Sequence, residues 1–98
     1  MYMTVRQQRV PSDQMEEVTR RVDVDWLETI RMAAGFVESY VVRRGDEDLV
    51  FYTTFLDESF REKGDERSAE WFGQRLMDLD TEVGDLWHGP VVAHAGQH

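Results

Sequence analysis

The fold is decided by residues 35–56, GFVESYVVRRGDEDLVFYTTFL. Two runs in this stretch, 36–42 and 49–55, are rich in the β-branched and aromatic residues that are typical of strands. Between the runs, residues 43–48 carry no apolar side chain, and Gly45 can adopt a positive φ, so we expect the chain to reverse there. Both runs are apolar on both faces, as strands covered on both sides are. The stretch therefore predicts a β-hairpin within a sheet that needs cover on each face.

The residues before the hairpin predict a strand followed by a helix. Residues 2–10, YMTVRQQRV, alternate in part between polar and apolar, as a strand does. Asp13 and Glu16 have the spacing of a capping box, which marks a helix start. An apolar stripe then follows at spacings of three and four: Met15, Val18, Val22, Trp26, Ile30 and Ala33. We expect the helix to loosen at 22–25, VDVD, which has poor helix propensity, and to end at Gly35.

The residues after the hairpin predict a second helix and a last strand. Asp57 is expected to cap the helix, and Gly64 with Asp65 to kink or restart it. Its buried stripe is expected to be Ala69, Phe72, Leu76 and Leu79, with Trp71 beside it. Residues 80–85 predict a loop, and residues 91–95, VVAHA, predict the last strand. Pro90 is expected at the beginning of that strand because proline cannot donate to a ladder, and residues 96–98 are expected to fray.

The predicted order is β-α-β-β-α-β, which is the ferredoxin-like arrangement of the α+β class. Four antiparallel strands would form one sheet with two helices on one face, in a single domain that spans residues 1–98. The other face of the sheet would then be uncovered. A second copy that packs sheet against sheet would cover it, so the sequence predicts a homodimer.

Composition excludes several classes of function. The formal net charge of −9 argues against nucleic acid and anionic membranes as partners, because phosphate binding needs clustered Lys and Arg. The chain has no run of about 20 apolar residues and no signal peptide at its start, so we expect a cytoplasmic protein. It contains no Cys, which excludes disulfides, thiolate metal sites and cysteine nucleophiles.

Four short motifs resemble those of the dimeric α+β barrel superfamily, and within it the antibiotic-biosynthesis-monooxygenase-like (ABM-like) branch. These motifs are Ala34-Gly35-Phe36 with Tyr40, Phe55-Leu56-Asp57-Glu58, Ala69-Glu70-Trp71 and Gly89-Pro90-Val91. The resemblance implies a homodimer whose sheets form a barrel, with a pocket between sheet and helices in each subunit. In the quinone-forming monooxygenases of this superfamily, a deprotonated phenol-like substrate itself reacts with oxygen, without metal, flavin or other cofactor.

The resemblance assigns roles to particular residues. An Arg of the first strand, Arg6 or Arg9, would hold an anionic oxygen, Tyr40 would hydrogen-bond the substrate, and His88 or His94 would move protons, with His88 the better base. The aromatic residues that would line the pocket are Trp26, Phe51, Trp71 and Trp87. The alternative is that these aromatic residues form the hydrophobic core, as large aromatic side chains in small proteins do.

Other chemistry has little support. His88, His94 and His98 lack the compact spacing of a zinc site, so no metal is expected. The chain has no Asn and no His in either predicted helix, which argues against haem degradation by analogy with the haem-degrading relatives. Nucleophile elbows and phosphate-binding glycine loops are also absent. Two hypotheses remain. One is a cofactor-independent monooxygenase acting on a small aromatic or polyketide-like molecule. The other is a non-catalytic homodimeric module that binds a small ligand, is stress-related or only stabilises a complex.

Overall fold

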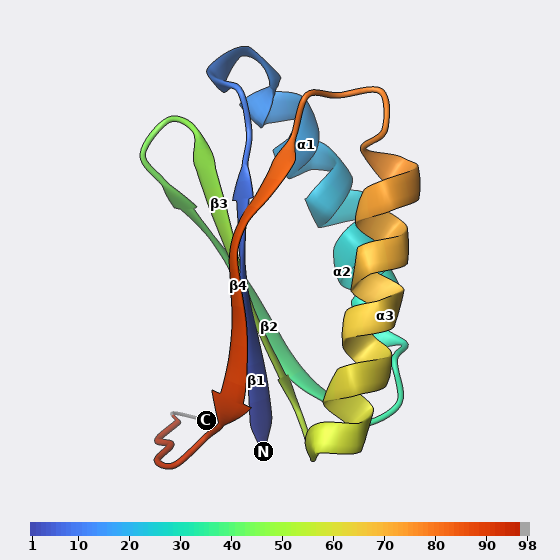
Figure 1. Cartoon of the computed structure of the whole chain (residues 1–98), viewed down its shortest axis with the longest axis vertical. Coiled ribbons are helices and arrows are strands. Elements are labelled where there is room, and N and C mark those ends of the chain that lie inside the picture. The colour runs from blue at the N-terminus through green and yellow to red at the C-terminus, as the bar shows by residue number, and fades with distance from the viewer. Residues whose placement is uncertain (97–98) are drawn as a thin grey trace.

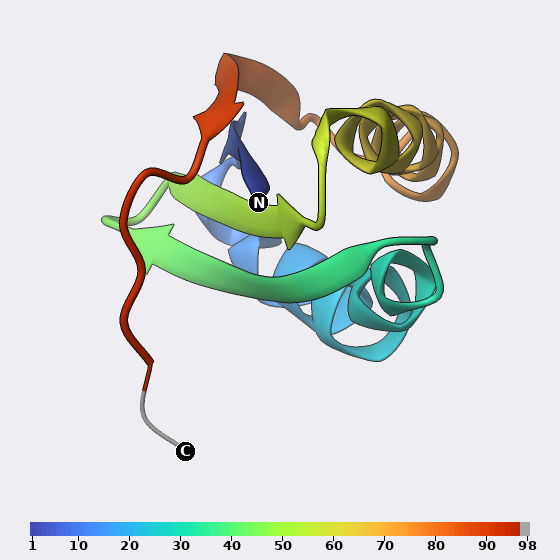
Figure 2. The same ribbon diagram turned by 90° about the horizontal axis from the view of Figure 1, so that it is seen from below.

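The structure is a computed structural model that describes residues 1–96 (Figure 1). Its elements follow the predicted β-α-β-β-α-β order: β1 Tyr2–Arg9, η1 Ser12–Gln14, α1 Met15–Arg21, η2 Val22–Trp26, α2 Leu27–Arg31, β2 Phe36–Arg44, β3 Asp48–Phe55, α3 Glu58–Arg75 and β4 Glu82–Pro90. The strands form one antiparallel sheet in the order β2-β3-β1-β4. All helices lie on one face of this sheet (Figures 1 and 2). The predicted ferredoxin-like α+β fold is therefore confirmed.

The hairpin of β2 and β3 forms as predicted. Tyr40 pairs with Tyr52 and Val41 with Phe51 across the two strands. Gly45 closes the turn between them with a φ of 67°. The side chains alternate across the sheet, so Phe51 joins the core under the helices and Tyr52 faces the opposite side.

The helical layer between β1 and β2 keeps the predicted apolar stripe. Five of its six members are buried, and Ala33 packs partly buried against them. The predicted loosening at 22–25 takes the form of a π-helical segment, η2. The predicted capping box is wrong: a 3-10 turn at Ser12 opens the layer, and no side chain caps it or α1. Asp13 and Glu16 are too far into the turns to cap them.

α3 is one continuous helix, so the predicted kink at Gly64 is wrong. Asp57 caps α3 as predicted, with its Oδ1 accepting a hydrogen bond from the backbone N–H of Phe60 at 3.0 Å. Gly64 instead allows a close contact, because a Cβ at this position would overlap the ring of Phe55, which is fully buried. The absence of a side chain lets α3 approach the sheet. Ala69, which the sequence places in the buried stripe, is exposed.

The last strand lies earlier in the chain than predicted. Glu82–Pro90 forms β4, whereas residues 91–95 have no regular structure, and Pro90 ends the strand instead of beginning it. Within residues 1–96, β4 pairs with β1 alone, and Tyr2, the first residue of β1, is already opposite Pro90. Only Met1 precedes it, and its carbonyl accepts a hydrogen bond from the Val91 N–H at 2.8 Å. An edge strand has solvent on one side, which also explains its polar composition. The expectations for Gln97 and His98 concern residues outside the described range.

The face of the sheet away from the helices is partly apolar. Tyr40, Tyr52, Val5 and Trp87 lie in register across the four strands on this open face. Tyr40 is 62% exposed and Trp87 57% exposed. Residues 91–96 run along this side, away from the helices (Figure 2). The sheet therefore carries apolar side chains on both faces, as the sequence predicts.

Candidate functional site

A cavity of about 290 Å³ lies between α3 and the sheet. It is lined by residues of every strand except β2: Thr4, Arg6, Phe51, Thr53 and Leu86. From the helical layer it is lined by Trp26, Asp65, Glu66, Ser68, Ala69 and Phe72. The cavity is near the lower limit of the volumes that hold small-molecule ligands.

The cavity exists because small side chains face one another across it. Ser68 and Ala69 on α3 lie where longer side chains would fill the space above Thr4 and Thr53. Its floor and walls are aromatic. Trp26 packs edge-on against Phe51 with ring centroids 4.9 Å apart, and Phe51 packs edge-on against Phe72 at 5.0 Å. These contacts fix the ring positions and provide flat apolar walls.

One end of the cavity is polar and centred on Asp65. The Thr4 hydroxyl donates to the Asp65 carboxylate, with oxygen–oxygen distances of 2.7 and 3.0 Å. Nη1 of Arg61 donates to Asp65 Oδ2 at 2.7 Å. Arg61 keeps only 8% of its side chain exposed, so Asp65 is the main counterion of a buried cation. The pair and the hydroxyl hold the carboxylate in one orientation.

Arg6 lies beside this polar end. Its guanidinium stacks on Phe72, with the central carbon 4.1 Å from the ring centroid, and its Nε donates to Gln8 Oε1 at 3.2 Å. Burial lowers the pKa of Arg6, and the charge of Asp65 acts in the opposite direction. An arginine stays protonated despite such a shift. Within residues 1–96, the two terminal nitrogens of Arg6 make no hydrogen bond, so they are free to bind a ligand.

Of the predicted site residues, the structure brings Arg6, Trp26 and Phe51 together in this cavity. Trp71 is buried elsewhere, between α3 and η2, where its indole N–H donates to Asp25 Oδ2 at 3.1 Å. It therefore contributes to helix packing. Its ring also contacts Phe72, which is the only cavity residue in aromatic contact with it among those described.

The remaining predicted residues lie outside the cavity. Tyr40 and Trp87 are on the open face of the sheet, the side opposite Phe51. His88 is exposed and pairs with Thr4; it lies two residues after Leu86 on the same face of β4 but does not line the cavity. His94 lies in the segment after β4, 3.6 Å from Glu38, and Arg9 is exposed at the end of β1.

The sequence interpretation missed Asp65, Thr4 and Phe72 as neighbours in one site. Asp65 was assigned only to a kink. The spacing of Arg61, Asp65 and Phe72 at i, i+4 and i+11 puts all three on one helix face. An acidic residue on the buried face of a helix, four positions after an arginine, is the signal that would have identified this polar end.

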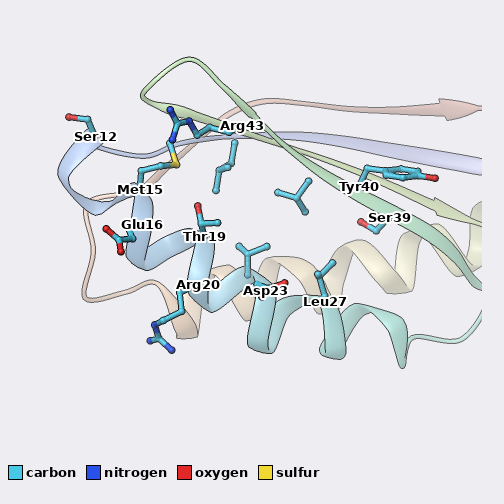
Figure 3. A pocket seen from close by; sticks show the side chains of 13 residues that line it. Ser12, Met15, Glu16, Thr19, Arg20, Asp23, Leu27, Ser39, Tyr40 and Arg43 are labelled. Carbon is cyan, nitrogen blue, oxygen red and sulfur yellow. The ribbon is translucent and has the colours of Figure 1, made fainter.

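A second, larger groove of about 920 Å³ runs between β2 and the layer of α1, η2 and α2. Figure 3 shows Thr19 and Leu27 pointing into it, Arg20 pointing outward, and the ring of Tyr40 directed away from the helices. Its charged residues lie on its rim, and Arg20 is held by Glu17 at 2.7 Å. The part-buried hydroxyl of Ser39, which also lines the groove, is already engaged by the Thr53 hydroxyl at 3.0 Å.

Residues 1–96 hold neither a cluster of metal-ligating side chains nor a membrane-spanning helix. No three His, Asp or Glu side chains come together there as a metal site. No helix in that range is long and apolar enough to cross a membrane.

Comparison with known proteins finds likeness in structure alone. No protein-family model matches the chain, and no curated protein matches it by sequence. Among solved structures, a dimeric ferredoxin-like protein from an uncultured marine organism superposes with a TM-score of 0.77 at 15% identity, covering 98% of each chain. The fold is thus that of dimeric ferredoxin-like proteins.

Two further solved structures carry named activities. The monooxygenase ActVA-Orf6 of Streptomyces coelicolor, in complex with the ligand nanaomycin D, has a TM-score of 0.69 at 20% identity and covers 98% of this chain and 92% of its own. The haem degrader MhuD of Mycobacterium tuberculosis, with two haems in its active site, has a TM-score of 0.77 at 18% identity and covers 98% and 100%. At these identities the likeness establishes the fold, which hosts more than one activity.

Proposed function

We propose that the cavity under α3 binds a small, planar, phenol-like aromatic molecule and that the protein promotes its oxygenation without a cofactor. The observation that carries this proposal is the cationic Arg6 guanidinium, with free terminal nitrogens, at the polar end of a cavity whose walls include three aromatic rings. Flat apolar walls with a few polar groups at one end are the usual composition of a site for such a ligand.

The proposed reaction requires little chemistry from the protein itself. A deprotonated phenol is electron-rich enough to react with oxygen itself, so the site needs to stabilise the anion, orient the ring and exclude water. Arg6 is placed to stabilise the anionic oxygen, because it is cationic and partly buried. Trp26, Phe51 and Phe72 provide the ring contacts. The activity named for ActVA-Orf6, a monooxygenase of the same fold, supports this proposal. The chain has no Asn, and the helices within residues 1–96 contain no His, which argues against haem degradation.

We also propose that the protein is a homodimer, built sheet against sheet on the open face. Val42 is 47% exposed there, on the same strand as Tyr40, and Tyr52, Val5 and Trp87 continue the row across the other three strands. A contiguous apolar surface of this kind on a small protein marks an interaction site. The existence of a dimeric protein of the same fold supports a second copy as the partner.

Anthrone provides a direct test of turnover, since its enol tautomer is a phenol and its oxidation by one O₂ gives anthraquinone and water. We expect the protein to accelerate oxygen consumption and quinone formation in a one-to-one ratio, with no added metal, flavin or nicotinamide. Arg6→Met should slow the reaction about 10²-fold, the cost of losing one charged hydrogen-bond donor in a transition state. Arg9→Met is the matched control, because Arg9 is on the same strand but exposed.

The outcome separates the two hypotheses. Binding of anthrone without any acceleration would support the non-catalytic ligand-binding homodimer. Equal rates for Arg6→Met and the unchanged protein would remove Arg6 from the site.

A further inference from the structure

Two opposite charges share the cavity without pairing. Arg6 and Asp65 both line it, and the charge of Asp65 acts on the pKa of Arg6, yet the two side chains form no ion pair with each other. A cation and an anion in a partly buried space usually close the gap between them. Here the stacking of Arg6 on Phe72 and the contact of Asp65 with Arg61 hold them apart.

The Asp65 carboxylate and the Arg6 guanidinium can each form further hydrogen bonds. The two carboxylate oxygens of Asp65 accept from Thr4 and Arg61, whereas a carboxylate accepts about four hydrogen bonds. The terminal nitrogens of Arg6 make no hydrogen bond to residues 1–96, since only its Nε is used, by Gln8. The space between them is therefore flanked by an unused acceptor on one side and unused donors on the other.

We infer that this space takes the hydroxyl group of a neutral phenol, which donates to Asp65 and accepts from Arg6. The inference rests on the proposed function of the cavity and names the form in which its ligand binds. A carboxylate has no proton to donate and meets the negative charge of Asp65. An ether can accept from Arg6 but cannot donate, and it leaves Asp65 without a partner.

The same arrangement defines where the phenol proton goes. The O–H bond of the ligand breaks, the proton joins a carboxylate oxygen of Asp65, and the negative charge moves onto the ligand oxygen beside Arg6. The total charge of the site is unchanged. Asp65 is then the proton acceptor, a catalytic residue that the sequence did not indicate, while Thr4 and Arg61 are positioning residues that orient its carboxylate.

Three ligands of one ring system test the inference on the unchanged protein: 2-naphthol, 2-methoxynaphthalene and 2-naphthoate. Their affinities are measured at pH 7 by calorimetry or by quenching of tryptophan fluorescence. We expect 2-naphthol to bind about 10- to 100-fold more tightly than either of the others, the loss that follows when a charged group is left without its hydrogen bond.

Variants of Arg6 and Asp65 test the two hydrogen bonds that the ligand hydroxyl is inferred to make. Arg6→Met should reduce the preference for 2-naphthol over the ether to less than about 3-fold, whereas Arg9→Met should keep it. Asp65→Asn alone would leave Arg61 buried without its counterion, so the informative comparison is Arg61→Met with Arg61→Met/Asp65→Asn. In the double variant, 2-naphthoate should gain affinity relative to 2-naphthol, because the repelling charge is gone.

The results distinguish failure of this inference from failure of the proposed function. Equal affinity for 2-naphthol and its methyl ether overturns the bridging hydroxyl, while the cavity remains an aromatic-binding site. If Arg6→Met keeps the preference for 2-naphthol over its ether, the role of Arg6 is overturned. If the double variant binds 2-naphthoate no better relative to 2-naphthol, the role of Asp65 is overturned. If none of the three ligands binds, the proposed function fails as well.

Discussion

At Gly64, α3 lies against the ring of Phe55 with no side chain between them, and replacing this glycine by Ala tests that close approach. In most helices such a change is stabilising by about 1 kcal/mol, because glycine has the higher conformational entropy when unfolded. Here the new methyl group would overlap the ring of Phe55, and even the third-nearest ring atom, Cε2, would lie 3.0 Å from it. Phe55 is fully buried and has no space to move into.

The expected magnitude follows from two opposing contributions. Overpacking a close-packed core costs about 1–3 kcal/mol, and the fully enclosed Phe55 ring puts Gly64→Ala near the upper value. Subtracting the helix-propensity gain of about 1 kcal/mol leaves a net destabilisation near 2 kcal/mol. For a chain of this size that corresponds to a fall in Tm of roughly 8–16 °C.

Gly73 provides the matched control on the same helix. A Cβ at Gly73 would meet nothing within 4 Å, so Gly73→Ala should raise the stability by about 0.5–1 kcal/mol. Thermal and urea unfolding followed by circular dichroism measure both variants. A Gly64→Ala variant as stable as Gly73→Ala would refute the close approach of α3 to Phe55, and with it the height of the cavity.

Four further changes have expected outcomes. Ala69→Leu should fill the cavity and abolish binding of 2-naphthol while the far-ultraviolet spectrum stays unchanged; retained binding would place the ligand elsewhere. Trp71→Phe should cost about 1 kcal/mol through its lost hydrogen bond and leave ligand affinity unchanged, which unfolding and calorimetry check together. Val42→Arg should give a monomer in sedimentation velocity; a persisting dimer would exclude the open face as its interface. The hydrogen bond from Arg21 lowers the pKa of Asp78 to about 2 from its ordinary value of 3.8, so its stabilising effect is present above pH 4 and lost as the pH falls towards 2. Asp78→Asn should accordingly be less stable than the unchanged protein at pH 7 and equally stable at pH 2.

The sequence was sufficient for the order and type of nearly all elements, because the hairpin and the first apolar stripe have strong periodicity. It was insufficient where tertiary contacts override local signals. Gly64 has the sequence signature of a kink, but its purpose is to make room for Phe55. Residues 91–95 have strand propensity, but within residues 1–96 their only backbone link to the start of β1 is the hydrogen bond from the Val91 N–H to the Met1 carbonyl, whereas the polar β4 pairs with β1 along its length.

The candidate site was only partly predictable for a related reason. Arg6, Trp26 and Phe51 were identified because an aromatic core and a strand arginine are visible in the sequence. Which face of β2 or β4 turns to the helices depends on register, which composition does not define. Tyr40 and Trp87 therefore lie on the opposite face.

The π-helical segment η2 keeps the apolar residues before and after it on the same side of the first helical layer. Val18, Val22, Trp26 and Ile30 are all buried although each is four residues from the last. In a regular α-helix each residue turns about 100°, so three steps of four residues would accumulate about 120° of drift. The wider turn of η2 absorbs that drift and keeps Trp26 at the floor of the cavity. The orientation of Trp26 at the floor of the cavity therefore depends on the π-helical winding of residues 22–26.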